Sequence, residues 1–112
     1  MELGPSDFDG KRLKNAQTSA VVFLASWCPF CQRFRPLFEV AAKQNTVPWA
    51  IADVSEDENE LWDVFNIKVV PTVVVFKNGE PMFRRDGVPG RGLSEEAIEE
   101  TMAQMKLLGA AN

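Results

Sequence analysis

The sequence predicts an α/β fold, arranged as a three-layer α/β/α sandwich with a central mixed sheet of four to five strands. Three observations support this prediction. The run Ala20–Ala25 is continuously apolar and rich in β-branched residues, which is typical of a strand buried on both faces. Strand-like and helix-like segments then alternate, which predicts parallel strands joined by right-handed crossovers. Asn78-Gly79 predicts a hairpin that adds an antiparallel pair to the sheet.

The size and composition of the chain are those of one domain. It has 112 residues, 46% of them apolar, and a formal net charge of −4, so we expect a single domain over residues 1–112. No apolar run approaches the length of a membrane helix, and the acidic balance argues against nucleic-acid binding. Residues 1–10 show neither a basic head nor an apolar core typical of a signal peptide, so we expect a cytoplasmic protein.

The first half of the chain is expected to form a helix, a strand and a second helix. Lys11–Gln17 carries a weak apolar face and predicts a short helix before the strand at Ala20–Ala25. After that strand, apolar residues recur at helical spacing, which predicts a helix over Pro29–Gln44. Cys28 then occupies the N-cap and Pro29 the first helical position, where the missing N–H of proline is not needed.

The next elements are a strand and a helix that begins with its own capping signal. Val47–Val54 is apolar enough to predict a second parallel strand. Ser55 and Glu58 have the spacing of a capping box, so we expect a helix to begin at Ser55 and to extend to about Phe65.

The last third of the chain predicts a hairpin and a covering helix. Thr72–Lys77 and Glu80–Asp86 are the two strands of the hairpin. Pro81 cannot donate a ladder hydrogen bond, so the second strand is expected at an edge of the sheet. Ser94 is the expected N-cap of a final helix, and Gly109 is its expected stop.

The only two cysteines, Cys28 and Cys31, are expected to carry the chemistry, because the chain has no histidine to act as a base or a metal ligand. A cysteine reacts as the thiolate, which the free N–H groups of a helix N-terminus stabilise. We expect Cys28 to attack a substrate disulfide. Cys31, which should be less exposed and less acidic, would then attack Cys28 and leave a Cys28–Cys31 disulfide and a reduced substrate.

Other roles for the two cysteines fit the sequence less well. A disulfide that closes so small a loop would stabilise the fold by at most about 2 kcal/mol. A closed zinc site would need two carboxylate ligands, because there is no histidine and no third cysteine. Attachment of a c-type haem would need a histidine where Gln32 stands. We therefore expect neither a metal nor another cofactor.

Around these cysteines the chain resembles the thioredoxin family, from about Thr18 to Gly109. The resemblance rests on the following residues: Trp27-Cys28-x-x-Cys31, Pro36, Val70-Pro71-Thr72, Phe76-Lys77-Asn78-Gly79-Glu80 and Gly87. It implies the thioredoxin fold and a thiol–disulfide oxidoreductase that acts as a monomer on disulfide-containing proteins. It also implies an electron donor, either an enzyme similar to thioredoxin reductase or a glutathione-based system.

The same resemblance assigns roles to the residues around the cysteines. It implies a cis peptide bond between Val70 and Pro71, with Pro71 facing the cysteines. It also implies that the backbone of Val70 binds an extended substrate strand by β-augmentation. The residues expected to support the active site are Trp27, Pro29, Phe30 and Pro71. The residues expected to form an apolar substrate-binding rim around Cys28 are Trp27, Val70, Pro71, Gly87 and Val88.

Two departures from the family pattern leave alternatives open. Pro29-Phe30 resembles the Pro-aromatic pair of glutaredoxins, so a glutathione-dependent glutaredoxin-like enzyme is one alternative. A non-catalytic redox-sensing binding module is another. Val22 stands where most thioredoxins have a buried aspartate that helps to move the proton of the second cysteine, and no carboxylate nearby in sequence replaces it. We therefore expect Cys31 to lose its proton to water or to the departing thiolate, with a strongly pH-dependent rate.

Overall fold

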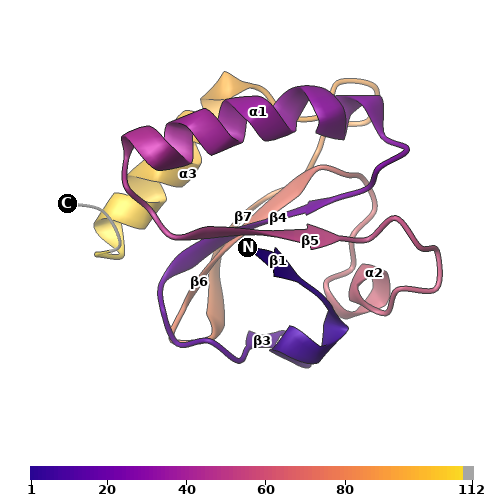
Figure 1. The fold of residues 1–112 in the computed structure, drawn as a ribbon, viewed down its shortest axis with the longest axis horizontal. Coiled ribbons are helices and arrows are strands. Elements are labelled where there is room, and N and C mark those ends of the chain that lie inside the picture. The colour runs from indigo at the N-terminus through magenta and orange to yellow at the C-terminus, as the bar shows by residue number, and fades with distance from the viewer. Residues whose placement is uncertain (110–112) are drawn as a thin grey trace.

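A mixed sheet of five strands forms the centre of the computed structural model, which describes residues 1–109 (Figure 1). The strand order is β1-β5-β4-β6-β7. The parallel strands are β1 (Glu2–Leu3), β5 (Trp49–Asp53) and β4 (Ser19–Leu24), and the antiparallel strands are β6 (Thr72–Lys77) and β7 (Glu80–Arg85). The predicted mixed sheet is thus confirmed, with one short strand, β1, that the sequence pattern did not indicate.

Helices and short segments cover both faces of this sheet. On one face α1 (Pro29–Gln44) and α3 (Glu95–Leu107) lie side by side (Figure 1). On the other lie α2 (Leu61–Val64) and a ribbon of β2 (Phe8–Asp9) and β3 (Arg12–Leu13), which follows a 3₁₀ turn, η1 (Pro5–Asp7). This arrangement is the predicted three-layer sandwich. No helix within residues 1–109 has the length and apolar character needed to cross a bilayer.

The central and edge strands are where their sequence patterns predict them. Every residue of β4 is buried, as expected of a strand with protein on both faces. Asn78 (φ 52°) and Gly79 (φ 84°) form the hairpin turn between β6 and β7. Pro81 lies on β7, which pairs with β6 alone and is therefore the edge strand.

The predicted helix at Lys11–Gln17 is wrong. Arg12 and Leu13 form a strand that turns back on Phe8 and Asp9, with Gly10 in the left-handed region (φ 60°). Leu13 is buried, and its N–H donates to the carbonyl of Gly79 (2.9 Å). Long-range contacts of this kind outweigh the weak helical pattern of a short polar segment.

The capping box predicted at Ser55 is also wrong. The Oγ of Ser55 hydrogen-bonds to the carboxylate of Asp53, and residues 55–60 form turns rather than a helix. The helix begins only at Leu61, whose N–H donates to Oδ1 of Asn59 (2.9 Å). The side chain that binds a free N–H at the start of this short helix is therefore that of Asn59, whereas the Oγ of Ser55 accepts from the N–H of Ser26 (2.8 Å).

An aromatic cluster joins α2 and the ribbon to the sheet. The ring of Phe65 lies 5.3 Å from that of Phe8, 5.1 Å from that of Phe23 and 5.9 Å from that of Phe76, measured between centroids. Such tilted and edge-to-face pairs add to the stabilisation from burial. The cluster holds α2 near the carboxyl ends of β4 and β5 (Figure 1). Trp62 belongs to α2, and its Nε1 donates to the carbonyl of Val54, the residue that follows β5.

The final helix begins after Ser94, as predicted, although the side chain of Ser94 makes no capping hydrogen bond. Gly109 follows the C-cap in the left-handed region (φ 83°), which is the usual way for a helix to stop. One side of α3 is fully buried through Ala97, Thr101 and Met105, and the helix contacts β4, β6 and β7.

Candidate functional site: a dithiol at a helix N-terminus

Cys28 and Cys31 lie at the junction of β4 and α1, as free thiols. Cys28 is the N-cap of α1, and its Sγ accepts a hydrogen bond from the backbone N–H of Cys31 (3.2 Å). The thiol of Cys28 also donates to the carbonyl of Val70 (3.5 Å). The sulfur of Cys28 is thus held between the start of the helix and the segment that precedes Pro71.

The two thiols differ less in exposure than the sequence led us to expect. Cys28 is 4% exposed and Cys31 is 2% exposed, so both are buried in this state. Burial, together with a side-chain hydrogen bond to Cys28, raises the pKa of Cys31 to about 12. Cys31 therefore stays protonated at neutral pH.

Pro71 lies directly before β6, and the peptide bond between Val70 and Pro71 is cis, as predicted. Gly87 packs against this segment. A Cβ atom at Gly87 would lie 2.7 Å from the carbonyl oxygen of Pro71 and 3.0 Å from Cγ1 of Val69, so only glycine fits. The hydroxyl of Thr72 donates to the carbonyl of Val69 (2.7 Å) and fixes the other side of the turn.

The predicted apolar rim is only partly exposed. Trp27 is 57% exposed and Val88 is 45% exposed, so these two present apolar surface near Cys28. Val70, Pro71 and Gly87 are buried, so any contact of Val70 with a substrate strand would involve its backbone. Of the remaining supporting residues, Pro29 is exposed and Phe30 is half-buried.

Trp62 is a site residue that the sequence analysis did not identify as one, because its helical spacing indicates a core residue. Its indole ring stacks on that of Trp27, with 6.3 Å between centroids and 7° between planes. The Nε1–H of Trp62 donates to the carbonyls of Val54 (3.0 Å) and Glu56 (3.2 Å). Trp62 is thereby fixed and supports the exposed ring of Trp27.

A polar network at the ends of β4 and β5 also escaped the sequence analysis. Its centre is Ser55, whose carbonyl accepts a hydrogen bond from Nε1 of Trp27 (3.0 Å). The Oγ of Ser55 accepts from the N–H of Ser26 (2.8 Å) and binds the carboxylate of Asp53. Gln32 donates to the carbonyl of Ser26 (3.0 Å). These bonds attach the segment before Cys28 to the end of the neighbouring strand.

On the other side of the cysteines, Phe30 packs against the loop that carries Val88. Val88 and Gly92 form a two-residue bridge, and a Cβ atom on Gly92 would lie 2.6 Å from Cβ of Phe30. The guanidinium of Arg33 lies over the Phe30 ring, 5.4 Å from its centroid, and donates to the carbonyl of Arg91 (3.5 Å). This side of the site is therefore positively charged.

Val22 is fully buried in β4, and its position holds no proton acceptor. The sequence analysis found no replacement carboxylate, but Asp53 is close enough to contribute to the raised pKa of Cys31. Asp53 pairs with Leu24 in the β4–β5 register, one residue before Ala25, whose backbone hydrogen-bonds Cys31. The pairing of parallel strands, which the sequence pattern does not specify residue by residue, brings this carboxylate to the site.

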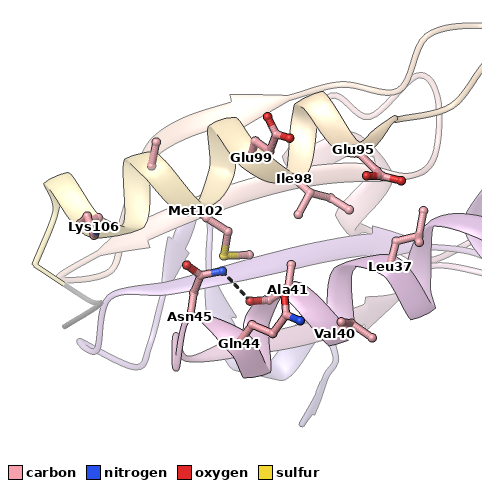
Figure 2. Close-up of a pocket in the computed structure, with 11 residues that line it drawn as sticks. Leu37, Val40, Ala41, Gln44, Asn45, Glu95, Ile98, Glu99, Met102 and Lys106 are labelled. Carbon is pink, nitrogen blue, oxygen red and sulfur yellow. Dashed lines mark hydrogen bonds between the residues drawn. The ribbon is translucent and has the colours of Figure 1, made fainter.

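A groove of about 600 Å³ between α1 and α3 is not part of this site (Figure 2). Leu37, Val40 and Ala41 form one wall, and Ile98 and Met102 form the other. None of the predicted site residues lines it. Within residues 1–109 there is also no group of three histidine, cysteine or carboxylate side chains placed to bind a metal ion.

A pair of thiols at the start of a helix, opposite a cis-proline and at the ends of two parallel strands, defines a dithiol protein of the thioredoxin-fold class. Comparison with known proteins agrees, because the family model described as thioredoxin matches residues 1–104. The chain belongs to the thioredoxin family.

Relatives include thioredoxin X of the Arabidopsis thaliana chloroplast, 30% identical over 88% of this chain and 56% of that protein. A thioredoxin of Mycoplasmoides gallisepticum is 35% identical over 67% of this chain and 76% of that protein. Endoplasmic reticulum resident protein 44.2 of Caenorhabditis elegans is 39% identical over 61% of this chain. The chain thus spans about half of the chloroplast relative and only 18% of the nematode relative.

Solved structures show the same fold. Thioredoxin f2 of Chlamydomonas reinhardtii has a TM-score of 0.76 and covers 100% of this chain and 98% of its own, at 18% identity. The thioredoxin of Fasciola hepatica has a TM-score of 0.67 at 28% identity, over 80% of this chain and 82% of its own.

Proposed function

We propose that the protein is a thiol–disulfide oxidoreductase that reduces protein disulfides through Cys28 and Cys31. The observation that carries this proposal is the position of the Cys28 sulfur, between the N–H of Cys31 and the carbonyl of Val70, beside the exposed ring of Trp27. This geometry combines a thiol at a helix N-terminus, a resolving thiol one helical turn away and an apolar surface for docking a substrate.

The proposed reaction transfers two electrons from the dithiol to the substrate. The thiolate of Cys28 attacks one sulfur of the substrate disulfide, and the other substrate sulfur leaves as a thiolate that takes up a proton. The thiol of Cys31 then loses its proton and attacks Cys28. The mixed disulfide breaks, the reduced substrate departs, and Cys28 and Cys31 form a disulfide. No cofactor takes part, and an external donor of the reductase or glutathione type returns the dithiol.

A substitution at Cys31 tests the proposal. Cys31→Ser removes the resolving thiol, so mixed disulfides between Cys28 and substrate proteins should accumulate and be visible on non-reducing gels. Cys28→Ser is the matched control and should trap nothing. Failure of Cys31→Ser to trap any protein, together with slow thiol exchange by the unmodified protein, would favour the redox-sensing module over the enzyme.

The Pro29-Phe30 pair favours one second candidate, a glutathione-dependent enzyme similar to glutaredoxins. It predicts turnover of a glutathionylated peptide with glutathione as the only reductant.

The direction of exchange depends on the reduction potential, which spans about −270 to −120 mV from thioredoxin to oxidants of the same fold. Equilibration of the Cys28–Cys31 pair in glutathione buffers, with alkylation to count free thiols, measures this potential. A value near −120 mV would contradict the role of reductant.

A further inference from the structure

We propose that the Trp27–Trp62 pair forms a specificity subsite for a lysine or arginine side chain next to the disulfide of the substrate. This inference rests on the proposed function, since it concerns which disulfides Cys28 meets. It begins from the exposure of Trp27, whose ring is 57% exposed and directly precedes the nucleophile in the chain. A large exposed aromatic side chain beside a reacting atom is well placed to contact the substrate.

The ring of Trp27 is held in a fixed position before any substrate arrives. One face stacks on Trp62 at 7°, and Nε1 donates to the carbonyl of Ser55 (3.0 Å). Trp62 is itself held by two backbone carbonyls. Because the pair is already ordered, a ligand would not lose affinity by having to immobilise it. Trp62 is thus a positioning residue for the surface that Trp27 presents.

The charges around the aromatic pair indicate which side chain it would accept. Segment 53–67 contains six aspartate or glutamate residues and no lysine or arginine. The four ion pairs formed within residues 1–109 involve none of these six carboxylates. An exposed indole face next to a segment with this excess of carboxylates attracts a cation through both its π electrons and the net negative charge of the segment.

The opposite side of Cys28 carries the opposite charge. Arg33 lies over Phe30 and contacts the carbonyl of Arg91, and no carboxylate pairs with Arg33 or Arg91 within the described chain. A substrate segment that crosses Cys28 therefore meets negative charge on the Trp27 side and positive charge on the Phe30 side. This separation both attracts a cationic side chain to the aromatic pair and disfavours the reversed orientation.

Three model peptides test the proposal. Each has two cysteines joined by a disulfide, and they differ only in the residue next to one of these cysteines, which is Lys, Gln or Glu. The pre-reduced protein reduces each peptide by the two-step exchange described above, and kcat/KM is measured at low salt. We expect the Lys peptide to react about tenfold faster than the Glu peptide, with the Gln peptide between them. The preference should shrink as salt is added.

Two sets of variants locate the effect. Glu56→Gln with Glu58→Gln should lower the Lys-to-Glu ratio, whereas Glu96→Gln with Glu99→Gln, which removes the same charge from α3, should leave it unchanged. Trp62→Leu should lower the ratio, mainly through KM for the Lys peptide, and Trp62→Phe should restore part of it by restoring the stack. Circular dichroism shows whether each variant is folded.

The outcomes separate this inference from the proposed function. Equal rates for the Lys and Glu peptides with the unmodified protein would overturn the subsite, and so would an equal loss of preference in the α3 control. If none of the three peptides were reduced, the proposed oxidoreductase activity itself would be contradicted.

Discussion

Cys31 is the residue whose chemistry the surroundings change most clearly. Its side chain is 2% exposed, and burial is the main cause of the pKa of about 12. Asp53 adds to this effect because a negative charge nearby disfavours a second one. Both effects keep the resolving thiol protonated at neutral pH, so Cys31 must lose its proton before the second exchange step.

The raised pKa of Cys31 predicts that resolution accelerates with pH. Far below the pKa, the thiolate fraction grows about tenfold per pH unit, so the resolving rate should rise steeply from about pH 6 to about pH 9. The measurement starts from a mixed disulfide of Cys28 with a chromogenic thiol and follows release of that thiol. Asp53→Asn should lower the pKa of Cys31 and speed the step at a given pH. A resolving rate that does not change with pH would contradict this assignment.

At the scale of elements, the accuracy of each prediction depends on how much of the signal for that element lies in its own residues. Long or strongly patterned segments such as β4, α1 and β6 were predicted within one or two residues of their observed bounds, because their own apolar residues indicate which positions are buried. The two-residue strands β1, β2 and β3 were missed. β1 pairs with β5, far along the chain, whereas β2 and β3 pair with each other across a tight turn. All three carry too few residues for a periodic pattern.

The site residues also fall into two groups, those that local motifs identify and those that only the tertiary structure brings together. Cys28, Cys31, Pro71 and Gly87 belong to local motifs, and the sequence identified them. The stacked partner Trp62 and the acceptors at Ser55 and Asp53 were not identified, because tertiary pairing of β4 with β5 brings them to the cysteines. The spacing of Ser55 and Glu58 even predicted a different role, a helix cap, whereas the Oγ of Ser55 accepts from the N–H of Ser26 and donates to the carboxylate of Asp53.

The loop that follows β7 predicts a sensitive packing contact. Gly87→Ala would place a methyl group 2.7 Å from the backbone oxygen of Pro71, which cannot move without disturbing the turn opposite Cys28. We expect a loss of about 1–3 kcal/mol in the free energy of unfolding and a lower rate of disulfide reduction. Denaturant unfolding and the peptide assay measure the two effects. Gly4→Ala is a matched control, since nothing lies within 4 Å of the added atom. Equal stability of the two variants would contradict the contact.

At the scale of the whole molecule, the predicted α/β/α architecture is confirmed, while the predicted monomer and cytoplasmic location stay predictions. One aromatic cluster connects the layers on the ribbon side of the sheet, where Phe8 contacts Phe23, Phe65 and Phe76. The ribbon therefore contributes to the common core although its strands are only two residues long.

Removal of Phe8 should consequently destabilise the whole fold rather than the ribbon alone. Phe8→Ala leaves a cavity beside Phe65, and we expect a loss of about 3 kcal/mol in the free energy of unfolding. Urea unfolding followed by circular dichroism measures this loss. Leu107→Ala, at a position that is 78% exposed, serves as the control and should change stability by less than about 0.5 kcal/mol. A loss below about 1 kcal/mol for Phe8→Ala would mean that the ribbon is not part of the core.

The stack of Trp27 on Trp62 also makes the site visible to spectroscopy. Of the three tryptophans, these two lie beside the dithiol, while Trp49 lies on β5 against Phe38. The chain has no tyrosine, so its ultraviolet emission comes almost entirely from indoles. Two nearly parallel indoles next to Cys28 couple their electronic transitions, and a disulfide beside an indole quenches its fluorescence. The protein thus contains its own optical probe, which can report the redox state and the docking of a partner without any attached label.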